Sequence, residues 1–276
     1  MDSTTINAIL IAVFSVTALG AILAIILCVA SKLMHVQIDE RVEKLTAAMP
    51  GVNCGVCGYP GCSGYAVALI ADANVKANLC TPGGAELLTQ ISTILGVEAG
   101  SIEQKVAVVT CAGDQKARQK KMDYFGIKTC EAAKPLFGGE NACAYGCLGY
   151  GDCQKVCPCK AICMEDGLAR IIKELCNGCS LCVKSCPNKL ISIEDAGISV
   201  FVACKNIEKG AVVRKKCTFG CIGCTKCVKE CPGEAIVIEN NLAKIDHQKC
   251  KLFNDKQKCG KCAEVCITKC IELARS

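Results

Sequence analysis

The chain has 276 residues, including 28 cysteines, six phenylalanines, five tyrosines and no tryptophan. Such a cysteine content is typical of disulfide scaffolds, but these are small secreted chains, and the length of this chain argues against that class. The formal net charge of +6 omits any ions that the thiolates bind, and no nucleic-acid partner is expected. Because aromatic residues are few, the soluble part is expected to depend on bound metal for its folding energy.

The N-terminal segment is expected to be a membrane anchor over residues 1–31. Residues 6–30 carry no charge and are rich in Ile, Ala, Leu and Val, and as a helix they would span about 37 Å, enough to cross a bilayer. A cleaved signal peptide, the alternative, would begin with basic residues, whereas this chain begins Met-Asp-Ser-Thr-Thr. Lys32, Arg41 and Lys44 follow the span, so the positive-inside rule predicts a single-pass protein of the cell inner membrane with its cysteine-rich body in the cytoplasm.

The next segment, residues 32–52, is expected to form a short amphipathic connector helix. Its apolar residues recur at helical spacing, and a Pro-Gly pair ends the pattern. These residues are Ile38, Val42, Leu45, Met49, Pro50 and Gly51.

Residues 53–100 contain a first complete set of ligands for an iron–sulfur cluster. Three cysteines lie in a glycine-rich stretch, where the backbone can wrap closely around an inorganic core and direct N–H groups at its sulfurs, and a fourth follows in Cys-Thr-Pro-Gly-Gly. The alternatives are a redox-active Cys-x2-Cys pair or a zinc site. The four cysteines are Cys54, Cys57, Cys62 and Cys80.

An internal duplication follows a linking segment with a possible strand, residues 101–129. Six cysteines recur 74 residues later: Cys130, Cys143, Cys147, Cys153, Cys157 and Cys176 correspond to Cys204, Cys217, Cys221, Cys227, Cys231 and Cys250. The offset then becomes 80, because six residues are inserted within 251–258. This register predicts two ferredoxin-like repeats, residues 130–197 and 198–276, each with a small β-hairpin, over 162–171 and 236–245. The fold class is therefore α+β.

The cysteine runs of the two repeats have the ligand spacing of bacterial ferredoxins. In the pattern Cys-x2-Cys-x2-Cys-x3-Cys-Pro, three cysteines hold one [4Fe–4S] cluster and the fourth holds its neighbour. Zinc sites usually draw two ligands from each of two separated pairs, so these runs favour iron–sulfur. The sets predicted are Cys157, Cys176, Cys179 and Cys182; Cys221, Cys224, Cys227 and Cys266; and Cys231, Cys250, Cys259 and Cys262.

One site of the first repeat lacks a ligand in this register, because Tyr150 stands where the second repeat has Cys224. The nearest candidate is Cys143, whose spacing to Cys147 lets both thiols face one centre. The site would then consist of Cys143, Cys147, Cys153 and Cys186. Eight cysteines remain, and four of them are possible additional ligands: Cys111, Cys130, Cys204 and Cys217. In the alternative to Cys143 as a ligand here, Cys130, Cys143, Cys204 and Cys217 serve a further site or are inherited spares. Five [4Fe–4S] clusters are predicted, and a sixth that involves Cys111 and Cys130 stays open.

The sequence contains no dinucleotide-binding fingerprint and no nucleophile–base arrangement. No bound nicotinamide or flavin and no independent substrate-converting site are therefore predicted. The chain is expected to move electrons rather than to transform a substrate.

The chain closely resembles the B subunit of the Rnf complexes, which are ion-translocating electron-transport assemblies. The resemblance rests on the N-terminal span, on Cys-Gly-Val-Cys-Gly-Tyr-Pro-Gly-Cys-Ser-Gly-Tyr-Ala at 54–66, on Val-Thr-Cys-Ala-Gly-Asp at 109–114, on Tyr-Gly-Cys-Leu-Gly-Tyr-Gly-Asp-Cys at 145–153 and on the tandem runs. It covers essentially the whole chain. Two departures are an extra cysteine in Cys157-Pro-Cys159 and an Ile in place of Pro after Cys266.

In that family the complex couples ferredoxin oxidation and NAD⁺ reduction to Na⁺ or H⁺ movement. The resemblance implies a translocase subunit that accepts electrons from reduced ferredoxin and passes them through its clusters to other membrane subunits. Basic segments at 116–128 and 209–216 are candidate docking sites for an acidic ferredoxin. The alternatives are the iron–sulfur subunit of another membrane oxidoreductase and a non-redox metal-binding or assembly protein.

Overall fold

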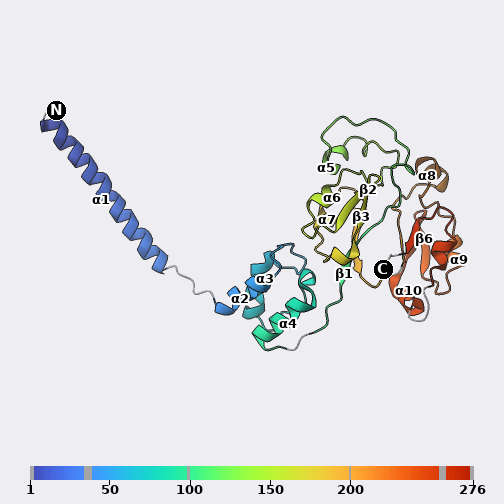
Figure 1. Cartoon of the computed structure of the whole chain (residues 1–276), viewed down its shortest axis with the longest axis horizontal. Coiled ribbons are helices and arrows are strands. Elements are labelled where there is room, and N and C mark those ends of the chain that lie inside the picture. Colours follow the sequence, from blue (N-terminus) through green and yellow to red (C-terminus); the bar gives the residue numbers. More distant parts are fainter. Residues whose placement is uncertain (1–2, 34–38, 98–99, 199, 255–258, 274–276) are drawn as a thin grey trace. The chain divides into compact units, whose positions relative to one another are not determined.

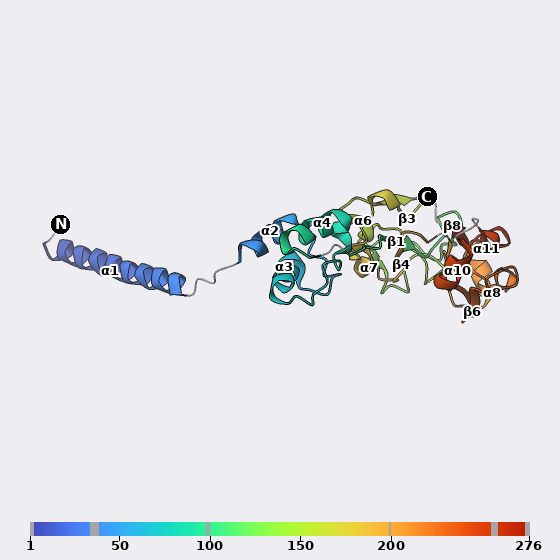
Figure 2. The same ribbon diagram turned by 90° about the horizontal axis from the view of Figure 1, so that it is seen from below.

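The computed structural model describes residues 3–33, 39–97, 100–198, 200–254 and 259–273. The chain divides into two compact units, Met1–Glu43 and Lys44–Ser276. Figures 1 and 2 label their helices and strands from two sides. The predicted α+β class, with one N-terminal apolar helix before the cysteine-rich domains, is confirmed.

The first unit contains one long helix, α1 (Ser3–Leu33). Its segment Leu10–Lys32 has a mean hydropathy of 2.8, and none of it is buried within the protein. Apolar side chains such as Phe14 and Ile11 are exposed all round the helix, which suits lipid rather than water. Among the described residues, α1 alone is long and apolar enough to cross a membrane.

Helix α2 (Glu40–Ala48) forms where the amphipathic connector was predicted. Leu45 and Met49 are buried in the second unit and Val42 is half-buried, as the apolar spacing requires. Ile38 lies outside the described residues. The helix ends before Pro50, since the residue before a proline avoids helical geometry.

An N-terminal lobe follows, with α3 (Gly61–Ala71), the 3₁₀ turn η1 (Thr81–Gly83) and α4 (Gly84–Leu95). Tyr65 is its largest fully buried side chain, and the Tyr65 hydroxyl donates a 2.7 Å hydrogen bond to the carbonyl of Lys76. This contact fixes the loop that carries Cys80 against α3. Gly61 (φ +84°) allows the chain to pass Asn53, because a Cβ there would lie 2.8 Å from Asn53 Oδ1.

Each ferredoxin-like repeat consists of two antiparallel two-stranded sheets and short helices. The predicted hairpins are confirmed: β2 (Ile162–Glu165) pairs with β3 (Leu168–Ile171), and β6 (Ile236–Glu239) pairs with β7 (Leu242–Ile245). In the second sheet of each repeat, β1 (Lys105–Val109) pairs with β4 (Ile191–Asp195), and β5 (Val200–Val202) pairs with β8 (Ile271–Leu273). The strand anticipated in 101–129 is thus β1. It completes the first repeat although it precedes residue 130, where the cysteine register begins that repeat.

The short helices carry or flank the cysteines. In the first repeat they are α5 (Cys130–Ala133), α6 (Asp152–Lys155), η2 (Lys173–Leu175) and α7 (Leu181–Ser185). In the second they are α8 (Gly210–Lys216), α9 (Lys226–Lys229), α10 (His247–Asn254) and α11 (Lys261–Glu264). The core of each repeat mixes aliphatic side chains with cysteines, so the apolar interior and the thiol sites form one body.

Candidate iron–sulfur sites

The N-terminal lobe brings its four predicted ligands to one cavity. The walls of this cavity include all four thiols together with Tyr65 and Pro82. The Cys62 backbone N–H donates a 2.8 Å bond to Asn53 Oδ1, which holds the glycine-rich loop in place. The cysteines are Cys54, Cys57, Cys62 and Cys80. Burial raises the pKa of Cys80 to about 11, so a thiolate there needs a cation beside it.

A second cavity lies in the first repeat. It gathers the predicted set Cys157, Cys176, Cys179 and Cys182, and Cys159 lies in the same wall. Backbone N–H groups point at the sulfurs: Ala161 donates to Cys157 Sγ and Ala107 to Cys176 Sγ, both at 3.3 Å. Such N–H···S bonds stabilise cluster thiolates and tune their potentials.

A third cavity lies in the second repeat. The predicted set Cys221, Cys224, Cys227 and Cys266 lines it. Cys270 is a fifth cysteine in the wall, and Cys224 is the exposed member of the set. Burial raises the pKa of Cys227 to about 11.

The other set of the second repeat lies beside residues outside the described part of the chain. Burial raises the pKa of Cys262 to about 11, and the neighbouring thiols of Cys250, Cys231 and Cys259 add to this effect. Ala235 N–H donates to Cys231 Sγ at 3.4 Å, as its counterpart Ala161 does in the first repeat. The structure thus brings this predicted set together as well.

The site beside Tyr150 differs from the sequence-based expectation. A cavity at this site has Cys147, Cys153 and Cys186 in its wall, and the fourth cysteine there is Cys130, not Cys143. Cys130 opens α5, which Thr129 caps by accepting a 3.2 Å bond from Ala132 N–H. Backbone N–H groups of Asp152 and Tyr150 point at the Cys130 sulfur. The chain at Tyr150 therefore supports a ligand that comes from another segment.

Cys143 lies instead in the wall of a separate cavity. Three of the cysteines without a clear role in the sequence line it as well: Cys111, Cys204 and Cys217. Sequence reasoning paired Cys130 with Cys204 through the 74-residue register and so missed this grouping. A signal was available, because Val106-Ala-Val-Val-Thr-Cys111 resembles Ser199-Val-Phe-Val-Ala-Cys204.

The spacing of the thiols suits a cluster better than a single metal ion. Within the described residues, no three His, Cys, Asp or Glu side chains come close enough to hold one ion. A tetrahedral zinc site with Zn–S bonds of about 2.3 Å needs sulfurs roughly 3.8 Å apart. A core of four irons and four sulfides keeps its thiolates farther apart, and each of these cavities has at least four thiols in its wall.

Comparisons with known proteins identify iron–sulfur families. A family model described as a putative Fe-S cluster matches residues 49–82, and one described as a 4Fe-4S dicluster domain matches residues 175–235. The chain is 41% identical over 267 residues to the B subunit of the Na(+)-translocating ferredoxin:NAD(+) oxidoreductase complex of Acetobacterium woodii, covering 96% of this chain and 78% of that protein. It is 39% identical over 266 residues to the proton-translocating counterpart of Clostridium ljungdahlii, covering 96% and 90%.

A third relative is the B subunit of the ion-translocating oxidoreductase complex of Methanosarcina acetivorans, 36% identical over 274 residues, which are 99% of this chain and 100% of that protein. These similarities extend over nearly the whole chain. The chain belongs to the family of B subunits of ion-translocating oxidoreductase complexes, an iron–sulfur family of electron transport.

Proposed function

We propose that this chain is the membrane-anchored subunit that takes electrons from reduced ferredoxin and passes them to membrane partners in an ion-translocating ferredoxin:NAD⁺ oxidoreductase. The observation that carries the proposal is the gathering of cysteines in fours, from the N-terminal lobe to the second repeat. The names of the Acetobacterium and Clostridium relatives support ferredoxin as the donor.

The residues of the chain hold and insulate the redox centres rather than react themselves. Bound [4Fe–4S] clusters supply one-electron carriers. The thiolates bind iron, and backbone N–H groups such as those of Ala161 and Ala235 stabilise the sulfurs. The proposed ligand sets are those predicted from the sequence, except that Cys130 takes the place of Cys143 beside Tyr150.

Contacts between neighbouring sites support a path through the body. Helix α7 carries Cys182, and its Lys184 Nζ donates a 2.9 Å bond to the carbonyl of Cys54 in the N-terminal lobe. Within the first repeat, Cys153 and Cys182 pack in one core. One electron at a time leaves reduced ferredoxin, which is oxidised, and the membrane partner that receives it is reduced.

Helix α1 would hold this body at the membrane. The basic residues Lys32, Arg41 and Lys44 favour a cytoplasmic body, because positive flanks remain on that side. The partners are then other membrane subunits of the same complex, and the donor is a protein of the cytoplasm.

Charge favours α8 as the docking surface for ferredoxin. Lys120, in the first basic segment, lies 2.7 Å from Asp123 and 3.4 Å from Glu140, so its charge is largely compensated. Arg214 and Lys215 on α8 are exposed and take part in none of the ion pairs found within the described residues. An acidic partner would therefore meet uncompensated positive charge at α8.

The proposal is tested with the whole chain, purified without oxygen and mixed with reduced ferredoxin. After mixing, we expect the visible absorbance of the oxidised clusters to decrease, and an equivalent amount of ferredoxin to be re-oxidised. Dithionite serves as the control, because it reduces clusters without a docking partner. A chain that dithionite reduces but ferredoxin does not would contradict the proposed donor.

A further inference from the structure

Two pairs of equivalent cysteines meet where the repeats touch. Cys111 lies two residues after the end of β1, and Cys204 lies two residues after the end of β5. One further backbone hydrogen bond extends each strand pairing beyond the strand ends. Thr110 N–H donates to Leu190 O at 2.8 Å next to the β1–β4 pair, and Ala203 N–H donates to Cys270 O at 2.7 Å next to the β5–β8 pair. The sequence register matches Leu190 with Cys270, so Cys111 is the structural counterpart of Cys204.

The second pair follows the 74-residue register, in which Cys143 corresponds to Cys217. Each repeat thus contributes one cysteine after its first strand and one from a later loop. Backbone bonds across the junction hold the pairs together: Ala112 N–H to Ala203 O at 2.8 Å, Thr218 N–H to Ala117 O at 3.1 Å and Gln119 N–H to Lys216 O at 3.0 Å. The four thiols line one cavity, in which Cys111 and Cys143 are buried.

Hydrogen-bond donors converge on these sulfurs. The backbone N–H of Cys221 donates to Cys204 Sγ at 3.3 Å, and the Asn206 side-chain amide donates to Cys143 Sγ at 3.5 Å. Asn206 is only 2% exposed, so its amide is kept inside for a partner there.

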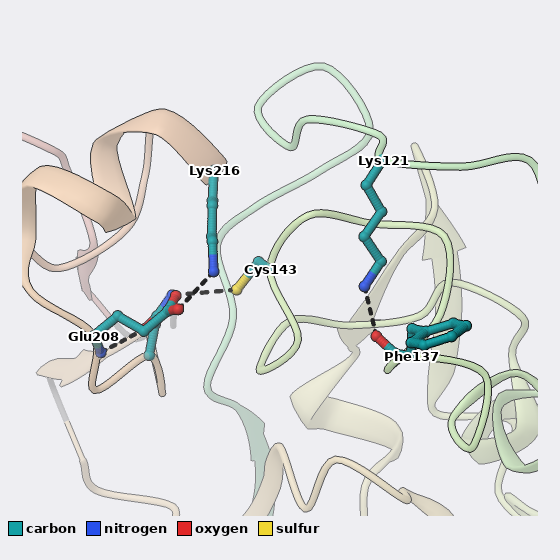
Figure 3. Close-up of polar contacts among 6 residues, drawn as sticks. Lys121, Phe137, Cys143, Glu208 and Lys216 are labelled. Atoms are coloured by element: carbon teal, nitrogen blue, oxygen red, sulfur yellow. Dashed lines mark hydrogen bonds and ion pairs between the residues drawn. The ribbon is translucent and has the colours of Figure 1, made fainter.

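A small polar network fixes the direction of that amide. The Asn206 Nδ2 group also donates to Glu208 Oε2 at 3.1 Å, and Asn206 Oδ1 accepts from Glu208 N–H at 2.8 Å. Lys216 Nζ in turn lies 2.5 Å from Glu208 Oε1, and Figure 3 shows Lys216, Glu208 and Cys143 at this network. The amide is thereby held with its N–H toward the sulfur, not its oxygen.

Arg118 adds a buried positive charge to the same wall. Its side chain is only 7% exposed and donates to carbonyl oxygens of Asp114, Cys147 and Gly167. It takes part in none of the ion pairs found within the described residues. A buried cation without a counter-charge is costly, so a negative group in this cavity would stabilise it. Four thiolates around a [4Fe–4S]²⁺ core carry a net charge of about −2, which meets that need.

We propose that Cys111, Cys143, Cys204 and Cys217 hold a sixth [4Fe–4S] cluster at the junction of the two repeats. Its ligands adjoin ligands of a site in each repeat: Cys147 N–H points at the Cys111 sulfur, and Cys221 N–H at that of Cys204. The junction cluster would therefore connect the cluster site of the first repeat with that of the second. An electron would pass from one of these clusters to the other through the junction cluster, and no covalent bond would be made or broken. The cluster site itself does not depend on ferredoxin being the donor.

The test is the iron, acid-labile sulfide and zinc content of the whole chain, purified without oxygen. Six clusters require about 24 irons per chain, and five require about 20. We expect about 24 irons and no stoichiometric zinc in the unmodified chain. The double variant Cys111→Ala/Cys217→Ala should lose about four irons, about four sulfides and one spin of the reduced [4Fe–4S]⁺ signal.

The matched control is Cys163→Ala, which removes a half-buried cysteine that lines none of the cysteine cavities described above and should leave all three quantities unchanged. About 20 irons in the unmodified chain, or one zinc in place of four irons, would overturn the proposal even if the double variant fails to fold. A folded double variant with unchanged iron would also overturn it. Ferredoxin-dependent reduction is measured separately, so failure of the donor assignment leaves this count intact.

Discussion

The Sγ atoms of Cys266 and Cys270 lie 3.6 Å apart, in the wall of the third cavity. Hydrogen bonds to Cys221 and Cys266 raise the pKa of Cys270 far above its usual range. When Cys266 binds iron as a thiolate, Cys270 is the group that can donate its S–H in this contact. The bond from Cys270 lowers the pKa of Cys266 to about 5. The counterpart of Cys270 in the first repeat is Leu190, which cannot donate.

The first prediction follows from this S–H···S bond. Cys270→Leu should lower the potential of the cluster held by Cys266, because a donor to a ligand sulfur stabilises the more negative reduced form. A bond worth about 1 kcal/mol more to the reduced form corresponds to roughly 40 mV for a one-electron couple. An EPR-monitored redox titration measures the shift. Cys163→Val, which introduces the residue found at its counterpart Val237, is the control, and an equal shift in it would refute the hydrogen-bond explanation.

The second prediction separates Cys130 from Cys143 as the ligand beside Tyr150. If Cys130 and Cys153 serve one site, Cys130→Ala/Cys153→Ala removes one [4Fe–4S]⁺ spin per chain. If Cys143 serves the junction site, Cys143→Ala/Cys153→Ala removes two. Spin integration of the dithionite-reduced variants distinguishes these outcomes. If the Cys130/Cys153 variant lost two spins and the Cys143/Cys153 variant lost one, Cys143 would be the ligand beside Tyr150, as predicted from the sequence.

The third prediction concerns removal of the iron. The cores of the repeats contain cysteines among their aliphatic residues, and buried thiols such as Cys153, whose pKa burial raises to about 12, would lose their counter-charge. We expect the second unit to lose cooperative thermal unfolding after iron chelation, while α1 remains helical in detergent. Circular dichroism of the whole chain before and after chelation measures both. A sharp melt of the iron-free body would show that the cores suffice without metal.

The fourth prediction tests the docking surface on α8. Arg214→Glu/Lys215→Glu should slow reduction by ferredoxin several-fold at low salt and weaken the dependence of the rate on ionic strength. Lys120→Glu/Lys121→Glu is the comparison, and it should have the smaller effect. Lys120 is compensated by carboxylates, and Lys121 Nζ already donates to the carbonyl of Phe137 at 2.5 Å (Figure 3). A larger effect from the Lys120 pair would move the docking site to residues 116–128.

The hairpins could be predicted because their turn residues favour the positive φ angles of a two-residue hairpin turn. Asp166, Gly167, Asn240 and Asn241 all adopt positive φ, between 46° and 70°, as two-residue hairpin turns require. The ligands within each cysteine run were equally accessible, since a short spacing leaves neighbouring thiols on one side of a loop. For these residues, local sequence determines local geometry.

The origin of Cys130 and the junction site could not be read from spacing alone. The segment between β1 and Cys130 is about twenty residues longer than that between β5 and Cys204. An alignment of the repeats by cysteine spacing alone does not reveal this insertion, and it pairs Cys204 with Cys130 instead of Cys111. The pairing of β1 with β4 and of β5 with β8 shows that Cys111 and Cys204 are equivalent, which the cysteine spacing does not.

Because Tyr150 stands where the second repeat has Cys224, we expect the two repeats to differ in their protection from oxygen. Cys130 reaches its site as a buried residue at the start of α5, whereas its functional counterpart Cys224 remains exposed. Brief exposure to air should therefore remove iron first from the site that includes Cys224. The two repeats, although alike in ligand chemistry, would then lose iron in air at different rates.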